Sequence, residues 1–198
     1  MSILSAPANN PGDTLILVDR EDREIGFLSK EQCHQGAGVL HRAFSVFLFN
    51  ARNEILLQQR SAQKPLWPLH WSNSCCSHPR RGESVEAAAL RRVREELCLH
   101  CDLAFLYKFE YQATFEDVGA EHELCWVFAG FAEGVVRADA AEIAASRYVS
   151  PDDLTAEIAA SPERFTPWLK LEWSAISARY LPAITARMLT SPSAVRTR

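Results

Sequence analysis

Apolar residues recur along the chain in short runs that are typical of β-strands and in longer segments with helical spacing. Runs rich in branched and aromatic side chains predict strands at residues 14–19, 43–50, 54–60, 104–115, 123–131 and 147–150. Residues 51–53 alone separate the second run from the third, which predicts a β-hairpin. Strands therefore come first in the chain, and they resume after an interruption.

The interruption is expected to be a loop followed by a helix. Residues 64–81 contain three prolines, which indicates a long ordered loop. Ser84 is a candidate N-cap for the helix that follows, in which Leu90, Val93 and Leu97 recur at helical spacing.

Two more helical segments are predicted after the last strand. Pro151 opens a helix through residues 152–160, and residues 166–189 form an amphipathic helix that Pro182 breaks or bends. Strands, one central helix, more strands and C-terminal helices together predict an α+β fold, an α/β/α sandwich with a mixed sheet.

Length and composition indicate a single domain, because 198 residues with 47% hydrophobic content suffice for one sizeable core. We assign this domain to residues 13–188, between flexible tails at residues 1–12 and 189–198. Acidic and basic residues are interspersed, with a formal net charge of −4, so nucleic acid is not an expected partner. The chain has no signal-peptide pattern and no apolar run close to the roughly 18 residues of a membrane span. We therefore expect a cytoplasmic protein without membrane insertion.

Six cysteines in a cytoplasmic chain of this size are expected to be reduced thiols. Cys75 and Cys76 are sequence neighbours whose side chains point to opposite sides of an extended backbone. A disulfide between these two residues is therefore not expected.

Three histidines and two glutamates form a candidate site for a divalent metal. His34 and His41 lie just before a predicted strand, and His78 follows the paired cysteines. Glu121 and Glu123 are two residues apart at the start of another strand, so both carboxylates point to one face. This nitrogen-rich set suits Mn²⁺, Zn²⁺ or Fe²⁺ better than Mg²⁺. Solvated side chains at a strand edge are the alternative interpretation of the same residues.

Several cations lie near these segments. Arg60 and Lys64 flank a loop entry, where they could pair with phosphate oxygens. Arg92 and Glu96 are four residues apart on the central helix, a spacing that is typical of an exposed surface with salt bridges.

The run GESVEAAALRRVREELCL, from Gly82 to Leu99, resembles a Nudix box. The positions that match the pattern are Glu83, Arg91, Val93, Glu95, Glu96 and Leu99. Ser77 stands at its first glycine and Cys98 at its last glycine, and Arg92 replaces a glutamate that Nudix pyrophosphohydrolases need for Mg²⁺. The replacement at Arg92 argues against ordinary Nudix hydrolysis.

Four stretches, HQGAGVLHRAFS, QRSAQKPLWP, WSNSCCSHPRRGES and EHELCWVF, closely resemble type 1 isopentenyl-diphosphate isomerases, a metal-dependent branch of the Nudix superfamily. Their order and separations also fit, and the resemblance covers roughly residues 14–175. It implies a Nudix-like catalytic domain and the reversible 1,3-allylic rearrangement of isopentenyl diphosphate to dimethylallyl diphosphate in isoprenoid biosynthesis. A Nudix pyrophosphohydrolase that cleaves nucleoside diphosphate derivatives and a non-catalytic diphosphate-binding module are the alternatives.

The resemblance also implies roles for individual residues. Catalytic roles fall on Cys76, Glu123 and Tyr111. Ligands of one ion, which is Mn²⁺, Zn²⁺ or Mg²⁺, fall on His34, His41, His78, Glu121 and Glu123, whereas Glu96 and the backbone carbonyl of Cys76 fall on positions that bind Mg²⁺ with the substrate diphosphate. Positions that hold the diphosphate are Lys30, Arg60, Lys64 and Arg92, and Trp168 closes over the hydrocarbon. No flavin is expected, because the chain lacks a glycine-rich dinucleotide fingerprint.

The implied reaction adds a proton at C4 of the substrate and removes one from C2. It passes close to a tertiary carbocation, so the site must be dry and must supply its own acid and base. We hypothesise that Glu123, assisted by Tyr111, protonates C4 and that Cys76 removes the C2 proton. The sequence leaves open which of the two residues acts first, which metal binds the histidines, the oligomeric state and the role of Cys75.

Overall fold

A computed structural model describes residues 14–190 of the chain. The tail predicted at residues 1–12 lies outside the described residues, as does most of the tail predicted at 189–198. The strands are β1 (Thr14–Val18), β2 (Glu24–Ser29), β3 (His41–Phe49), β4 (Ile55–Arg60), β5 (Trp71–Ser72), β6 (Cys75–Ser77), β7 (Cys101–Phe115), β8 (Gly119–Ala132) and β9 (Ile143–Val149). The helices are α1 (Lys30–Cys33), α2 (Val85–Leu97), α3 (Pro151–Ala160), the 3-10 turn Pro162–Arg164, α4 (Pro167–Arg179) and α5 (Leu181–Thr190).

Strand β3 lies at the centre of the mixed sheet. It pairs in parallel with β8 along its whole length and antiparallel with β6 at residues 44–46. Beyond Phe49 the chain turns directly into β4, which confirms the predicted hairpin. Strands β3 and β8 therefore come from the two halves of the chain but lie side by side in one sheet.

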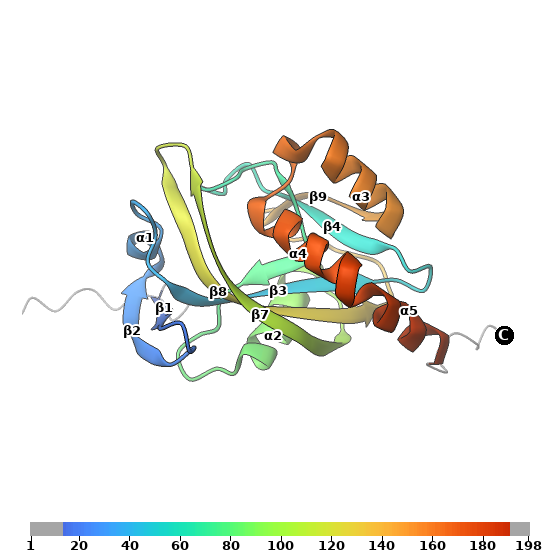
Figure 1. Cartoon of the computed structure of the whole chain (residues 1–198), viewed down its shortest axis with the longest axis horizontal. Coiled ribbons are helices and arrows are strands. Elements are labelled where there is room, and N and C mark those ends of the chain that lie inside the picture. Colours follow the sequence, from blue (N-terminus) through green and yellow to red (C-terminus); the bar gives the residue numbers. More distant parts are fainter. Residues whose placement is uncertain (1–13, 191–198) are drawn as a thin grey trace, which may run out of the picture.

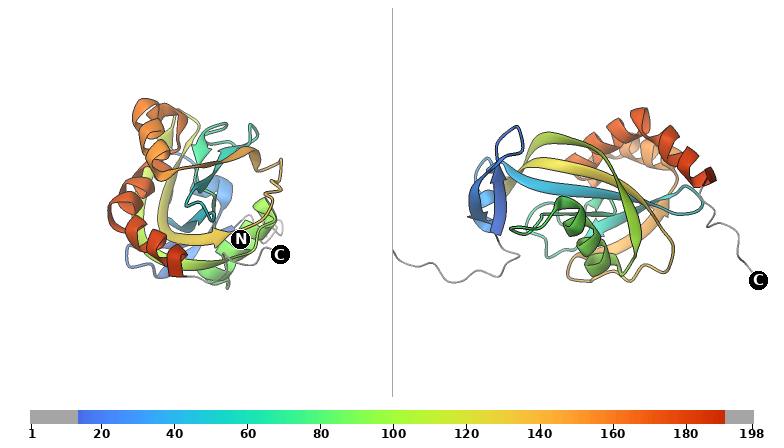
Figure 2. Two further views of the ribbon diagram at one scale, coloured as in Figure 1. Left: turned by 90° about the vertical axis from the view of Figure 1, so that its right-hand side faces the viewer. Right: turned by 90° about the horizontal axis from the view of Figure 1, so that it is seen from below.

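Helices cover both faces of this sheet. Alternate side chains of β3 point to opposite sides, so Phe44, Val46 and Leu48 pack against α2, whereas Phe47 and Phe49 pack against the C-terminal helices. Figures 1 and 2 show α2 on one side of the sheet and α3, α4 and α5 on the other. The predicted α/β/α sandwich with a mixed sheet is confirmed.

The predicted helices are present with local differences. Ser84 caps α2 by accepting a hydrogen bond from the backbone N–H of Ala87. The helix ends at Cys98, whose φ of 54° lies in the left-handed region that favours glycine, at the position where the Nudix box has its last glycine. The C-terminal segment divides at Tyr180 into α4 and α5, which confirms the break predicted near Pro182. Among the described residues, no helix is long and apolar enough to cross a bilayer.

The sequence analysis missed five short elements, one of which is the 3-10 turn Pro162–Arg164. Strand β2 and helix α1 were not predicted, and the segment predicted as a loop at residues 64–81 contains β5 and β6. Strands β5 and β6 have two and three residues, and they form because the edges of β4 and β3 offer backbone partners. Strand β2 is held by its antiparallel pairing with β1.

Candidate functional site

A cavity lies where α1, the loop after β4, strand β6, helix α2 and the first half of β8 meet. The predicted site residues that line it are Lys30, His34, Arg60, Lys64, Cys76, His78, Arg92, Tyr111, Glu121, Glu123 and Trp168. The two other predicted residues, His41 and Glu96, are buried directly behind this lining. The structure thus brings together residues that are scattered over most of the sequence.

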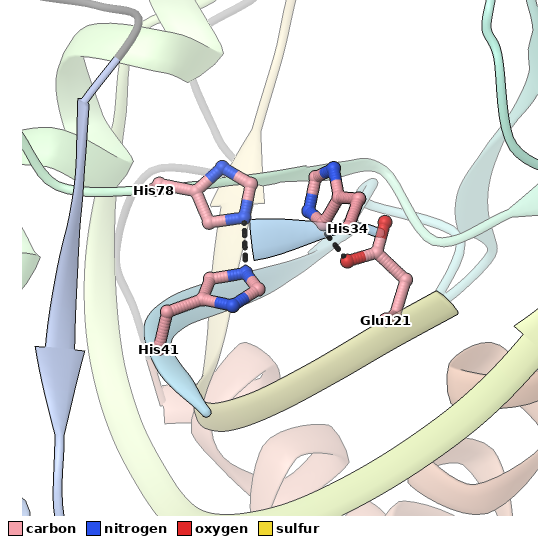
Figure 3. A group of neighbouring side chains, drawn as sticks. All are labelled: His34, His41, His78 and Glu121. Atoms are coloured by element: carbon pink, nitrogen blue, oxygen red, sulfur yellow. Dashed lines mark hydrogen bonds and ion pairs between the residues drawn. The ribbon is translucent and has the colours of Figure 1, made fainter. Parts of the chain in front are cut away.

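Three imidazoles and one carboxylate converge at one end of the cavity (Figure 3). His34 follows α1, His41 opens β3, His78 follows β6, and Glu121 lies on β8. One ligand atom from each of the four residues lies within 4.8 Å of the others. The scattered set predicted from the sequence is therefore a cluster in space.

Backbone contacts position these side chains. The parallel register of β3 and β8 places His41 directly beside Glu123. The carbonyl of His34 accepts a hydrogen bond of 2.9 Å from the backbone N–H of Ala120. This close approach requires a glycine at the preceding position, because a Cβ on Gly119 would lie 2.4 Å from the His34 carbonyl oxygen.

The donor atoms of this cluster fit a divalent cation. Nδ1 of His41 lies 2.7 Å from the carbonyl of Val39, which accepts its proton and leaves Nε2 as a lone-pair donor toward the cluster. Burial, reinforced by the neighbouring His78, lowers the pKa of His41 to about 4, so the ring is neutral. Nε2 of His34 and Oε2 of Glu121 are buried and lie 3.0 Å apart, and neither atom has a hydrogen-bond partner beyond this contact. Neutral imidazoles and an unsatisfied carboxylate oxygen are the ligands that Mn²⁺ and Zn²⁺ take in proteins.

Glu123 joins this cluster to the rest of the cavity. Its Oε1 lies 3.2 Å from Nε2 of His78, and its Oε2 accepts a hydrogen bond of 2.8 Å from the hydroxyl of Tyr111. Burial, together with the negative charge of Glu121, raises the pKa of Glu123 to about 7. The carboxyl of Glu123 can therefore hold or release a proton near neutral pH.

Cys76 and Cys75 lie on opposite sides of β6, as predicted. Cys75 is fully buried in the apolar core beneath α2, whereas Cys76 lines the cavity. Both residues are free thiols. Burial raises the pKa of Cys76 to about 12, although the charges of Arg60 and Lys64 act in the opposite direction.

Aromatic side chains form an apolar wall beside Cys76. Trp168 packs edge-on against Trp67, with ring centroids 5.3 Å apart, and its ring centroid lies 6.2 Å from that of Tyr111. Nε1 of Trp168 donates hydrogen bonds to Ser72 and Asn73, which orient the ring. Sequence reasoning missed the positioning roles of Ser72 and Asn73, because both are reached only through the packing of α4 on β5.

Another part of the cavity lining, which we call the cationic wall, carries Lys30, Arg60, Lys64 and Arg92. Arg92 contacts the buried carboxylate of Glu96, which is 2% exposed. The interpretation of this pair as an exposed surface salt bridge is therefore wrong, because α2 turns that face toward the sheet. Arg91 instead makes the more peripheral pair with Glu83, at 2.7 Å.

The sequence analysis missed Glu142, an acidic residue that lies among the cations of this wall. Its carboxylate contacts Lys64 and lies 3.0 Å from the guanidinium of Arg92. Burial alone would raise the pKa of Glu142, but the hydrogen bond from Lys64 and the charge of Arg92 lower it to about 2. The surrounding sequence, AAEIAA, carried no signal, since the pairing of β9 with β4 brings this segment to the cavity.

Known proteins resemble this chain over most of its length. Residues 39–169 match the family model of the NUDIX domain. A protein of Photorhabdus laumondii subsp. laumondii named isopentenyl-diphosphate Delta-isomerase 1 is 42% identical over 83% of this chain and 94% of its own length. A protein of Nocardia farcinica named isopentenyl-diphosphate Delta-isomerase is 44% identical over 77% of this chain and 88% of its own length.

Solved structures share the fold at lower sequence identity. A Deinococcus radiodurans protein superposes with a TM-score of 0.61 at 23% identity and covers 74% of this chain and 89% of its own. A MutT protein from Methanosarcina mazei gives a TM-score of 0.60 at 16% identity, with coverage of 70% and 94%.

Proposed function

The chain belongs to the isopentenyl-diphosphate Delta-isomerases of the Nudix family, and from this premise we propose that it interconverts isopentenyl diphosphate and dimethylallyl diphosphate. The reaction moves a carbon–carbon double bond from the 3,4 to the 2,3 position. One observation carries the proposal: Cys76, Glu123 and Tyr111 line one cavity that has an aromatic wall and a cationic wall.

The two walls match the two ends of the substrate. Lys30, Arg60, Lys64 and Arg92 would hold the diphosphate, so that binding energy at this end positions the alkene. Trp168 would cover the hydrocarbon, where the negative face of its ring stabilises a developing carbocation. The aromatic wall also excludes water, which would otherwise quench that cation.

Glu123 and Cys76 are the proposed acid and base. With its pKa raised to about 7, Glu123 can carry the proton that it donates to C4, while Tyr111 holds the other carboxylate oxygen. Cys76 would accept the C2 proton as a thiolate. Burial disfavours this form and raises the pKa of the thiol to about 12, while the charges of Arg60 and Lys64 act in the opposite direction. A neutral Cys76 with an ionised Glu123 is the complementary state, and it is ready for the reverse reaction. One proton shared between the two groups therefore accounts for reversibility.

We propose that His34, His41, His78, Glu121 and Glu123 hold one Mn²⁺, Zn²⁺ or Mg²⁺ ion, and that Glu96 and the carbonyl of Cys76 hold Mg²⁺ with the diphosphate. The first ion would tune the proton affinity of the Glu123 carboxylate, and the second would neutralise phosphate charge. No flavin is needed for this proton chemistry. We retain the expectation that the enzyme acts in the cytoplasm on a small-molecule substrate.

The test is incubation of the metal-loaded protein with isopentenyl diphosphate and Mg²⁺ in D₂O, without flavin or reductant, followed by NMR. We expect dimethylallyl diphosphate that carries solvent deuterium. Released phosphate without a rearranged alkene would instead support a Nudix pyrophosphohydrolase, and unchanged but bound substrate would support a binding module.

A further inference from the structure

Glu142 occupies the cationic wall where the diphosphate is proposed to bind. One of its carboxylate oxygens lies 3.0 Å from Nη2 of Arg92, and the other contacts Nζ of Lys64. Both oxygens of one anion thus engage two of the four cations assigned to the diphosphate.

The backbone fixes Glu142 in this position. Its carbonyl accepts a hydrogen bond of 2.9 Å from the N–H of Ser61, and its own N–H donates to the carbonyl of Asp139 at 3.0 Å. The next residue, Ile143, pairs with Arg60 across β9 and β4. These backbone contacts keep Glu142 at the rim of the cavity, within reach of Lys64 and Arg92.

A second carboxylate lies beside the first. Glu96 is almost fully buried and contacts the same guanidinium nitrogen of Arg92 that Glu142 approaches. A diphosphate placed on Lys64 and Arg92 would therefore meet two carboxylates at close range. Like charges at such distances repel strongly where water is partly excluded, unless a divalent cation lies between them.

We propose that Glu142 makes diphosphate binding conditional on a divalent cation. In the absence of the ion, its carboxylate competes with phosphate oxygens for Lys64 and Arg92. When the ion accompanies the diphosphate, Glu142 and Glu96 face positive charge instead of bare phosphate, and the repulsion is removed. The residue thereby selects the metal-complexed diphosphate over the free anion, and this inference rests on the proposed diphosphate site.

Inorganic pyrophosphate is the probe, and isothermal titration calorimetry with Mg²⁺ or with EDTA is the measurement. The wild type should bind pyrophosphate at least about tenfold more tightly with Mg²⁺, the difference that one strong like-charge contact produces. Glu142→Gln keeps the shape of the side chain but removes its charge. We expect this variant to bind metal-free pyrophosphate about tenfold more tightly than the wild type does. The difference in affinity between the Mg²⁺ and EDTA conditions should therefore be smaller in the variant.

Glu157→Gln is the matched control, because both carboxylate oxygens of Glu157 contact Arg147 in a similar ion pair away from the cavity. This variant should keep the Mg²⁺ dependence of the wild type. Thermal unfolding of each protein establishes that it is folded, and Glu142→Asp provides a charged second variant that should retain the dependence.

Each outcome separates the inference from the proposed function. Wild-type protein that binds pyrophosphate equally well with Mg²⁺ and with EDTA would overturn the role of Glu142 and leave the diphosphate site intact. A Glu142→Gln variant that stays as dependent on Mg²⁺ as the wild type would overturn it too. Absence of pyrophosphate binding under both conditions would instead count against the diphosphate site itself, and with it against the inference.

Discussion

The hydroxyl of Tyr111 donates a hydrogen bond of 2.8 Å to Oε2 of Glu123, the residue directly opposite it on β7 and β8. Cross-strand pairing thus fixes the orientation of the carboxyl that we propose as the proton donor. Because Oε2 is engaged, Oε1 is the oxygen left to face the substrate and His78.

Tyr111→Phe should lower kcat about 10- to 100-fold and leave KM for isopentenyl diphosphate within about threefold. The substitution removes the hydrogen bond that orients the Glu123 carboxyl, but it leaves the contacts to the diphosphate in place. Steady-state kinetics test this. Tyr107→Phe, on the same strand but outside the cavity lining, is the control and should keep near-full kcat. An equal loss in both variants would indicate a general effect on β7 instead of a role for the Tyr111 hydroxyl.

The neighbouring cysteines should respond differently to substitution. Cys76→Ser should lower isomerisation about a thousandfold or more, because a hydroxyl cannot replace the thiol as a base near neutral pH. Deuterium incorporation by NMR measures this loss. A Cys76→Ser variant with near-full turnover would remove the proposed role of the thiol.

Cys75→Ala should retain turnover but reduce the free energy of unfolding by about 1 kcal/mol, because it leaves a small void in the core beneath α2. Urea denaturation measures this change. A severe loss of turnover in the folded Cys75→Ala protein would contradict the separation of the two thiols by the strand.

Mn²⁺ or Zn²⁺ should raise the unfolding temperature of the chelator-treated wild type. An ion at 100 times its dissociation constant stabilises the folded state by about 2.7 kcal/mol. His41→Ala should abolish most of this shift. His122→Ala is the matched control, since His122 lies between the two glutamates on β8 but pairs with Glu110 at 3.1 Å on the other face. Equal shifts in both variants would place the ion elsewhere.

A buried acid behind the site predicts a pH dependence of stability. Glu172, on α4, is fully buried, and its Oε2 has no hydrogen-bond partner. Burial raises the pKa of Glu172 from 4.5 to about 8. A raised folded-state pKa means that the protonated acid favours the folded protein, so this contribution is fully present below about pH 4.5 and is lost as the pH rises to about 8.

Glu172→Gln should remove the loss of stability that the ionisation of Glu172 causes as the pH rises. Between pH 5 and pH 8 the wild type should lose a few kcal/mol more stability than the variant, since one pKa unit corresponds to about 1.4 kcal/mol. Urea denaturation at both pH values tests the difference. Glu157→Gln, which removes a partly exposed ion pair, should not be more stable than the wild type at pH 8. Parallel pH profiles for wild type and Glu172→Gln would contradict the prediction.

The elements that the sequence predicted are those whose own residues determine their structure. Strands β3 and β8 consist mainly of apolar side chains, β4 begins with three of them, and the side chain of Ser84 caps α2. Strands β5 and β6 could not be predicted in this way, because backbone partners from distant strands decide whether two or three residues become extended.

The grouping of the candidate site residues was only partly predictable from the sequence. Spacing suggested that Glu121 and Glu123 share a face, but it could not show that His34 and His78 meet them, and the family resemblance supplied that grouping. Neither approach found Glu142, whose place depends on the register of β9 against β4. The burial of Glu96 likewise depends on which face of α2 packs against the sheet, which a charged helical turn does not reveal.

The parallel register of β3 with β8 also bears on how the chain folds. Parallel neighbours cannot be joined by a tight turn, so the pairing of His41 with Glu123 closes a long loop of the chain. Loop-closure entropy opposes this long-range pairing, and such topologies fold slowly. His41 and Glu123, at the two ends of that closure, both belong to the proposed ligand set. Capture of a metal ion during refolding would therefore report that this long-range pairing of β3 with β8 has formed.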